Sequence, residues 1–178
     1  MAKKHIRPIT IVGNLAYITL TKGYVAVVDA EDAHLVACDN WQAKERGSRT
    51  YACRSQWCGG HYEERKMHRV IIGASGDHSV DHIDGDGLNN RRSNLRLASN
   101  LQNSWNQSTA KNNASGYRGV DFDKATSRWR ARIQCNGKSH WLGFHSTAVD
   151  AKAAYDAAAM TLYGEFARLN DERRAWPK

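Results

Sequence analysis

Two runs of alternating apolar and polar residues, SRWRARIQ and SHWLGFHS, flank an Asn136-Gly137 turn near the C-terminal end of the chain. This is the strongest short-range signal for a β-hairpin, because Asn and Gly both tolerate the positive φ angles of a two-residue turn. The preceding GYRGVDF predicts a third strand. The following TAVDAKAAYDAAAMTLYG predicts a helix, with Thr147 and Asp150 at capping-box positions and Gly164 at its end. We therefore expect three antiparallel strands packed on one helix.

The middle strand of this sheet would have a basic face. Side chains alternate between the two faces of a strand, which separates Arg128, Arg130, Arg132 and Gln134 from Trp129, Ala131 and Ile133. Arginines on one face repel one another unless a polyanion is present. Because guanidinium groups bind phosphate and pair bidentately with guanine, we expect this face to contact the major groove of duplex DNA.

The charge of the chain also favours a polyanionic partner. The formal net charge is +8, and the densest positive stretch, 111–141, contains most of the expected sheet. No apolar run approaches the roughly 18 residues that indicate a membrane span. The basic N-terminal segment lacks the apolar core of a secretory signal. We therefore expect a cytoplasmic protein with no membrane partner.

Residues 79–107 predict a separate small unit. SVDHID and NLRLA are short strands around the turn-forming GDGLNNRRS, and a Ser-x-x-Gln capping box at Ser99 begins a helix through Trp105. Asp84 and Asp86 are expected to be solvated turn residues. The core of this unit would be small and only marginally stable alone, so we expect it to pack on the N-terminal region. Its members would be Leu95, Leu97, Leu101 and Trp105.

The Asp81-His82 pair has the chemistry that phosphodiester hydrolysis needs. An imidazole with a pKa near 6.5 can take a proton from water at neutral pH. A carboxylate and an amide oxygen suit a hard cation, whose remaining ligands come from phosphate and water. Adjacent strand residues point to opposite faces, so Asp81 and His82 share one site only if the chain bends near Gly85 and Gly87.

The stretch DHIDGDGLNNRRSNLRLASNLQN resembles the HNH nuclease motif, in the Asp-His variant of phage and intron homing endonucleases, over roughly 68–107. The resemblance implies that Asp81 and Asn103 bind the metal, His82 is the general base, and Asn94 braces the loop and orients the histidine. Asn100 and Asn106 share a helix face with Asn103 and are the alternatives to it. His68 and Arg69 resemble a supporting pair. Asn103, where many relatives have a third histidine, shifts the expected metal from zinc toward one Mg²⁺ or Mn²⁺ per site.

Residues 113–170 resemble the APETALA2/ethylene-response DNA-binding domain, which also occurs fused to phage HNH nucleases. The matching segments are GYRGV, WRARI, WLGFHST, DAKAAYDAAA and GEFARLN. The resemblance implies DNA contacts at or beside Arg118, Arg128, Arg130, Arg132 and Trp141, and more weakly at Lys138. Asp121 and Asp123 stand where plant relatives carry Arg, which argues against the same sequence specificity. Trp129, Phe144, Tyr155 and Phe166 are expected in the core, while Trp141 is open between core and DNA contact.

The fold class expected from these patterns is α+β. An N-terminal mixed region, 1–73, with short strands and a helix near 30–38, would support an HNH unit with the ββα-metal fold at 74–107. A linker at 108–115 would lead to the APETALA2-like domain at 116–172. Cys53 and Cys58, with His61 just beyond, lack the spacing of a zinc knuckle, which argues against structural zinc.

The expected activity is divalent-metal-dependent endonucleolytic hydrolysis of duplex DNA to 5′-phosphate and 3′-hydroxyl ends, by nicking. The alternative is a non-catalytic, sequence-specific DNA-binding regulator with a degenerate HNH scaffold. An RNA-directed nuclease fits less well, because the RNA major groove is too narrow for the sheet to read. We expect no obligate protein partner, a monomer or weak dimer, and action in the host cytoplasm if a phage encodes the chain.

Overall fold

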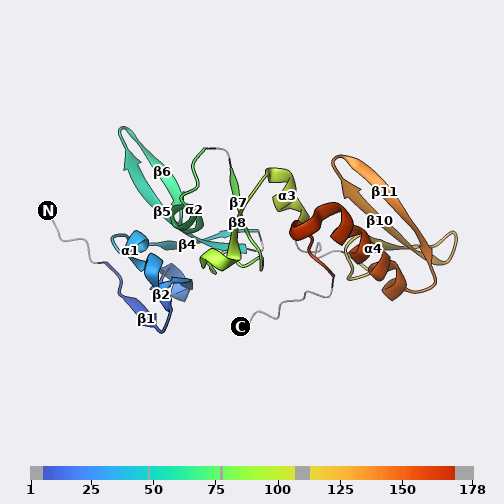
Figure 1. The fold of residues 1–178 in the computed structure, drawn as a ribbon, viewed down its shortest axis with the longest axis horizontal. Helices are drawn as coiled ribbons and strands as arrows, with labels where there is room; N and C mark the ends of the chain where they lie inside the picture. The colour runs from blue at the N-terminus through green and yellow to red at the C-terminus, as the bar shows by residue number, and fades with distance from the viewer. Residues whose placement is uncertain (1–5, 48, 77, 107–112, 171–178) are drawn as a thin grey trace. The chain divides into compact units, whose positions relative to one another are not determined.

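The computed structural model describes residues 6–47, 49–76, 78–106 and 113–170 of the chain. Residues 108–112 of the expected linker therefore lie outside the described residues. Antiparallel sheets are combined with short helices and one long helix, which confirms the α+β prediction. The chain divides into two compact units, Met1–Ser99 and Asn100–Lys178 (Figure 1).

The first unit begins with a small antiparallel sheet. β1 (Ile9–Val12), β2 (Leu15–Thr19) and β3 (Val25–Asp29) pair in that order, with the 3-10 turn η1 (Thr21–Gly23) between β2 and β3. Alternation along β2 and β3 buries Ala16, Ile18, Ala26 and Val28. The 3-10 turn η2 (Ala30–Asp32) then leads into α1 (Ala33–Val36), which confirms the helix expected near 30–38.

A second antiparallel sheet consists of β4 (Gln42–Arg46), β5 (Arg49–Cys58) and β6 (His61–Lys66). α2 (Met67–Ile72) follows β6 directly and ends at Gly73, whose φ of 66° suits a residue without a side chain. Met67 and Ile71 of α2 pack with Trp41 in a core that extends along the chain from Ala16 to Leu95. Both sheets and α2 therefore share one core.

β7 (Ser79–His82) and β8 (Leu95–Ala98) form a two-stranded ribbon around the loop 83–94, which includes the 3-10 turn η3 (Arg92–Asn94). The prediction that this unit has a small core of its own is wrong. Leu97 is 52% exposed and Leu101 is 45% exposed. Leu95 instead joins the large core of the first unit, and Trp105 stacks on Tyr163 of the second unit.

The second unit contains the expected helix α3 (Asn100–Trp105) and the expected sheet, β9 (Val120–Asp123), β10 (Arg128–Cys135) and β11 (Lys138–His145). The strands are antiparallel in the order β11-β10-β9. Asn136 and Gly137, with φ of 51° and 75°, form the two-residue turn between β10 and β11. The hairpin predicted from this dipeptide is confirmed.

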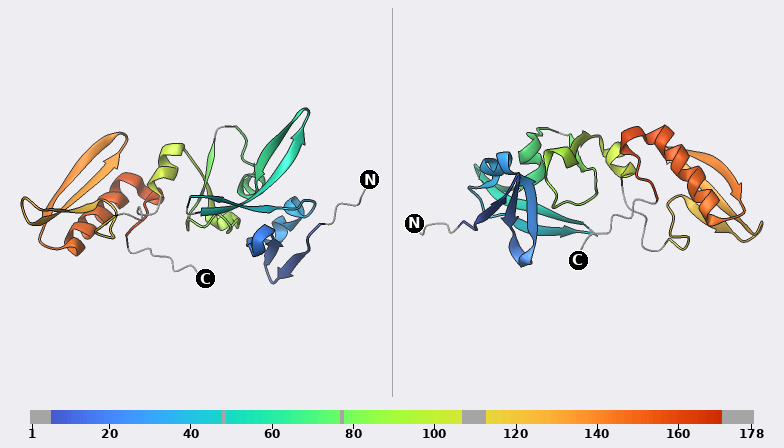
Figure 2. Two further views of the ribbon diagram at one scale, coloured as in Figure 1. Left: turned by 180° about the vertical axis from the view of Figure 1, so that it is seen from behind. Right: turned by 60° about the horizontal axis from the view of Figure 1, so that its bottom comes forward.

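α4 (Ala148–Tyr163) packs on this sheet, and the two views of Figure 2 show it alongside the strands. Thr147 caps the helix by accepting a 3.1 Å hydrogen bond from the Asp150 amide, as predicted. Gly119 has no room for a side chain, because a Cβ there would lie 2.1 Å from the Tyr155 ring. The 3-10 turn η4 (Gly164–Phe166) ends the helix. Among the described residues, no helix has the length and apolar character needed to cross a membrane.

Candidate active site

Asp81 lies on β7 directly opposite Arg96 on β8. Its Oδ2 accepts hydrogen bonds from Arg96 Nη2 at 2.7 Å and from Nε at 3.0 Å. The Asp81 side chain is fully buried, and that of Arg96 is 13% exposed. A buried carboxylate is costly without an opposite charge beside it, so the Arg96 guanidinium both pairs with Asp81 and orients it.

His82, the next residue, has different neighbours. Its Nε2 lies 3.3 Å from the Oδ1 of Asn90, which itself is fully buried. The His82 ring meets the ring of His68 edge to face, at a centroid distance of 4.8 Å, and Tyr51 lies 5.9 Å from both rings. Burial lowers the pKa of His82, partly offset by Asn90 and by the carboxylates of Asp84 and Asp81. The imidazole is therefore neutral at pH 7 and able to accept a proton.

His68 and Arg69, the supporting pair on α2, have different contacts. His68 is 4% exposed, and its Nδ1 has no hydrogen-bond partner among the described residues. Burial, followed by the positive charges of His82, Lys66 and Arg69, lowers the pKa of His68 to about 2. Arg69 donates to the carbonyls of Ala74, Gly76 and His78, at 3.4, 2.9 and 2.6 Å. It thereby holds the chain that leads into β7.

Asn94 fastens the two ends of the loop 83–94. Its Oδ1 accepts from the Asp84 amide at 3.0 Å, and its Nδ2 donates to Asp84 Oδ1 at 2.9 Å and to the Asn89 carbonyl at 2.8 Å. Asp84 also accepts from Asn89 Nδ2 and from the Asp86 amide. The expectation that Asp84 and Asp86 are solvated is wrong, because both are partly buried and burial raises the pKa of Asp86.

The same loop is attached to the N-terminal sheet by contacts that the sequence analysis did not foresee. Val27 on β3 donates to the Leu88 carbonyl at 2.9 Å and accepts from the Asn90 amide at 2.7 Å. Arg92 forms two 2.8 Å hydrogen bonds to the buried carboxylate of Asp32. Gly87 packs so closely on β5 that a Cβ would lie 2.4 Å from the Thr50 carbonyl.

The residues expected to bind metal are divided between the two units, with Asp81 in the first and Asn103 on α3 in the second. Among the described residues, no group of three or more His, Cys, Asp and Glu side chains could hold a metal ion. The oxygen donors themselves, one carboxylate and one amide, suit a hard cation that takes its other ligands from phosphate and water. Metal binding by Asp81 and Asn103 therefore stays a prediction, supported by the chemistry of their oxygen atoms.

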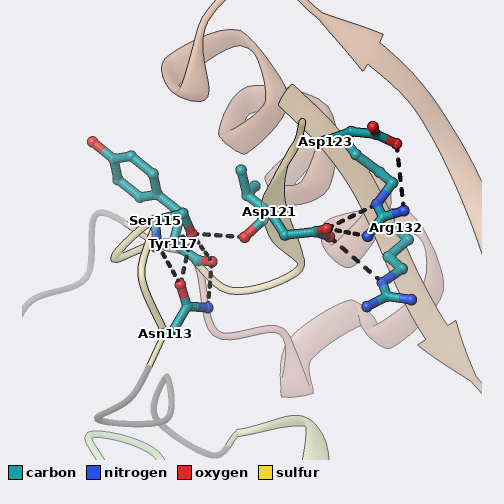
Figure 3. A network of polar contacts seen from close by, with 8 residues as sticks. Asn113, Ser115, Tyr117, Asp121, Asp123 and Arg132 are labelled. Carbon is teal, nitrogen blue, oxygen red and sulfur yellow. Dashed lines mark hydrogen bonds and ion pairs between the residues drawn. The ribbon is translucent and has the colours of Figure 1, made fainter. Parts of the chain in front are cut away.

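In the second unit, the exposed face of β10 carries the arginines as predicted, with Ala131 and Ile133 buried behind them. The expected repulsion is wrong for Arg130 and Arg132, because carboxylates on β9 lie beside them and reduce it (Figure 3). Arg130 donates through both Nε and Nη2 to Asp121 Oδ2. Its Nη1 lies 3.6 Å from Asp123 Oδ2, and Arg132 Nε lies 3.8 Å from Asp121 Oδ1.

Three other residues expected at the DNA interface differ from one another. Trp141 is 56% exposed and contacts Phe144 edge to face at 4.9 Å, so it does not belong to the core. Phe144 is also exposed, at 38%, which corrects its assignment to the core, whereas Tyr155 and Phe166 are buried. Lys138 is exposed beside the hairpin turn. Arg118 instead binds the carbonyls of Trp105 and Ser104 at the end of α3.

Sequence reasoning found Asp81, His82 and Asn94 because they lie in one contiguous motif. It missed two neighbours of His82, Asn90 and Tyr51, whereas His68, expected in a supporting role, does contact the His82 ring. The Asn89-Asn90 pair inside the motif was a usable signal for Asn90, since a buried amide in such a loop needs a partner. Tyr51 lies in a separate sheet, and nothing in its local sequence indicates this contact.

Comparison with known proteins gives two family matches. The HNH endonuclease family model matches residues 65–105, and the AP2 domain model matches residues 115–165. Protein 3.8 of Escherichia phage T7 is 40% identical over 91 residues, which cover 51% of this chain and 74% of that protein. An uncharacterized HNH endonuclease of Acanthamoeba polyphaga mimivirus is 33% identical over 165 residues, covering 90% and 83%. APETALA2-like protein 2 of Oryza sativa subsp. indica is 42% identical over 60 residues, covering 34% and 14%. No solved structure matches the chain significantly.

Proposed function

Because the chain belongs to the HNH endonuclease family and contains an AP2 domain, we propose that it hydrolyses phosphodiester bonds of duplex DNA with a divalent metal ion. The observation that carries this proposal is the environment of His82. It is a buried, neutral imidazole, held by an amide, next in the sequence to a carboxylate that pairs with Arg96. Relatives from a phage and a giant virus suggest action in the host cytoplasm.

The contact with Asn90 determines which ring nitrogen of the neutral His82 carries the hydrogen. Asn90 Nδ2 donates to the Leu88 carbonyl at 3.0 Å, which turns its Oδ1 toward His82. Because Oδ1 accepts only, His82 Nε2 must carry the hydrogen, and Nδ1 is the proton acceptor. We assign His82 Nδ1 as the base that takes a proton from the attacking water.

Asp81 and Asn103 would hold one Mg²⁺ or Mn²⁺ ion, and when bound this ion would stabilise negative charge on the phosphate and on the departing oxygen. Arg96 pairs with the Asp81 carboxylate and keeps it oriented. Asn94 keeps the loop closed around His82. Hydrolysis of this kind leaves 5′-phosphate and 3′-hydroxyl ends. Because one chain carries one such site, each encounter nicks a single strand.

The exposed face of the sheet β9–β11 would grip the duplex. Arg128, Arg132 and Trp141 are exposed on this sheet. Arginine side chains reach phosphates and base edges in the major groove, and an exposed indole packs on sugar or base surfaces. The AP2 domain match covers all three positions. In this proposal the sheet supplies most of the binding energy and the HNH unit supplies the reaction.

The test is incubation of supercoiled plasmid with the full chain and Mg²⁺ or Mn²⁺. We expect nicked circles to appear first, and EDTA to prevent their formation. His82→Ala should lower the cleavage rate by about 10²–10⁴-fold, the usual contribution of a general base, with DNA binding unchanged. Asn90→Ala should give a smaller loss of about 10–100-fold, as for other residues that orient a histidine.

His78→Ala is the matched control, because His78 is an exposed imidazole just before β7. It should cut as fast as the parent chain. Metal-dependent cleavage by His82→Ala at the rate of the parent chain would contradict the assignment of His82 as the base.

The alternative is a DNA-binding regulator with an inactive HNH unit. The observation that favours it is the burial of both Asp81 and His82, which are 1% and 4% exposed. A chain that binds duplex DNA but leaves the plasmid intact with either metal would establish this alternative.

A further inference from the structure

The exposed face of the second-unit sheet is not uniformly basic. Asp121 faces Arg130 across the β9–β10 pair, and Asp123 faces Arg128. The Asp121 carboxylate bridges two arginines, with Oδ2 bound to Arg130 and Oδ1 3.8 Å from the Nε of Arg132 (Figure 3). Two carboxylates therefore lie among the cations that are expected to contact DNA.

The position of Asp121 is fixed by the start of β9. Ser115 Oγ donates to the carbonyl of Val120, the residue before Asp121, at 2.7 Å. Asn113 in turn accepts from the Ser115 amide at 3.0 Å and donates to the Tyr117 carbonyl at 2.9 Å. Figure 3 shows this chain of contacts running from the turn to the ion pairs. The carboxylate is thus held at the surface by an ordered backbone.

The carboxylates change what Arg130 can bind. A phosphate brought onto Arg130 would also approach Asp121 and Asp123, and like charges at an interface oppose binding. The edge of a base pair is uncharged and meets no such penalty. A guanidinium whose Nε and Nη2 are held side-on keeps a fixed orientation, and arginine so oriented can donate to guanine O6 and N7.

Building on the DNA-binding half of the proposed function, we propose that Asp121 and Asp123 determine specificity. They exclude the phosphate backbone from Arg130 and hold its guanidinium for a guanine edge in the major groove. Arg128 and Arg132, which flank Arg130 on the same face of the strand and are more exposed than it is, contact phosphates and position the sheet. Discrimination thus comes from weakened non-specific binding as well as from the base contact.

The test measures binding by the full-length His82→Ala chain, which keeps the DNA intact. Its probes are a random-sequence 30-base-pair duplex and duplexes selected from that pool by the same chain. Asp121→Asn and Asp123→Asn remove charge with little change in shape. Each should bind the random duplex about 3- to 10-fold more tightly, with a salt slope steeper by up to about 0.9, the value for one added phosphate contact. Preference for the selected duplexes should fall by about 10-fold.

Glu165→Gln is the matched control, because Glu165 is an exposed acid on η4, outside the strands of the sheet. It should leave both affinities nearly unchanged. In an Arg130→Ala background, Asp121→Asn should no longer strengthen random-duplex binding, because the effect acts through Arg130. The inference is overturned if Asp121→Asn and Asp123→Asn both bind the random duplex no more tightly than the parent. It is also overturned if Asp121→Asn still strengthens this binding in the Arg130→Ala background.

The outcomes separate this inference from the proposed function. A His82→Ala chain that binds neither duplex overturns the DNA-binding role together with the inference. A chain that binds both duplexes equally, and whose Asp121→Asn variant behaves the same, overturns the inference alone. Cleavage of plasmid by the parent chain is judged independently of both.

Discussion

His68 is the residue whose burial has the clearest measurable consequence. It lies against His82 with a centroid distance of 4.8 Å, and its Nδ1 has no hydrogen-bond partner within the described part of the chain. Protonation of His68 would place a positive charge inside the core, against the His82 ring and without a hydrogen-bond acceptor at Nδ1 among the described residues. The native structure therefore requires a neutral imidazole at this position, and acid works against the fold here.

We predict that acid destabilises the protein through His68. Its folded-state pKa of about 2 lies below the value near 6.5 of an unfolded chain. Between these values the unfolded state binds the extra proton, so stability is lost as pH falls below 6.5, by about 2 kcal/mol at pH 5. Urea unfolding at pH 7.5 and 5 measures this loss. In His68→Phe the loss of stability between these two pH values should be smaller by about 2 kcal/mol.

His61, an exposed residue at the tip of the β5–β6 hairpin, provides the control for removal of an imidazole. His61→Gln should show the parent's full loss of stability. A His68→Phe variant that loses as much stability as the parent would contradict the role assigned to His68.

The loop 83–94 depends on elements far away in the sequence. Arg92 binds Asp32, whose side chain is 5% exposed, and Val27 on β3 pairs with Leu88 and Asn90. A hydrogen-bonded charge pair of this kind contributes more than an exposed surface pair. The first-unit fold thereby positions the loop that surrounds His82.

We predict that Asp32→Asn lowers the free energy of unfolding by about 2 kcal/mol, the usual contribution of hydrogen bonds to a charged partner. Urea denaturation measures it. Glu45→Gln breaks the exposed ion pair with Lys22, whose side chains are 62% and 53% exposed, and should cost at most about 0.5 kcal/mol. Equal effects of the two substitutions would show that the Arg92 pair does not fasten the loop.

A second element-level prediction concerns α3, which carries Asn103. Arg118 binds the carbonyls of Ser104 and Trp105, and Trp105 stacks on Tyr163 at 4.6 Å. If Arg118 acts through α3, Arg118→Ala should slow plasmid cleavage about 10-fold or more while preserving DNA affinity and its salt slope. Arg128→Ala should instead weaken binding and flatten the slope by about 0.9. Equal changes in slope would make Arg118 a phosphate contact.

Local patterns predicted the elements well, and their partners poorly. The Asn136-Gly137 hairpin, the Thr147 cap and the alternation along β10 follow from neighbouring residues, and all are present. Arg92 and Asp32 are far apart in the sequence, and the residues around either one do not indicate that they pair. The apolar residues of 95–105 were assigned to one core because they are close in sequence, although they pack in two units.

At the scale of the whole chain, the excess of positive charge sets the strength of binding to nucleic acid. The net charge is +8, yet several cations on the described surface are neutralised by carboxylates, including Arg130 and Arg46. Fewer cations are therefore available to phosphate than the composition suggests. The number that act on DNA is a measurable property of the molecule.

We predict a linear fall of the logarithm of affinity with the logarithm of salt concentration for a random-sequence duplex. Each phosphate contact contributes a slope of about −0.9. With Arg128, Arg132 and Lys138 as the contacting cations, the slope should be near −3. Fluorescence anisotropy of the His82→Ala chain between about 50 and about 300 mM KCl, a range that spans physiological ionic strength, measures it. An affinity that does not change with salt concentration would show that the sheet does not contact DNA phosphates.

The boundary between the two units has a practical consequence for protein engineering. The division falls after Ser99, and α3 is fastened to the second unit by the Trp105 stack and by Arg118. A chimera that grafted a foreign recognition module at residue 107 would strip α3 of these supports, whereas a graft that carried 100–106 along with its native module would retain them. A change of recognition module in the proposed nuclease should therefore be made at a junction before α3.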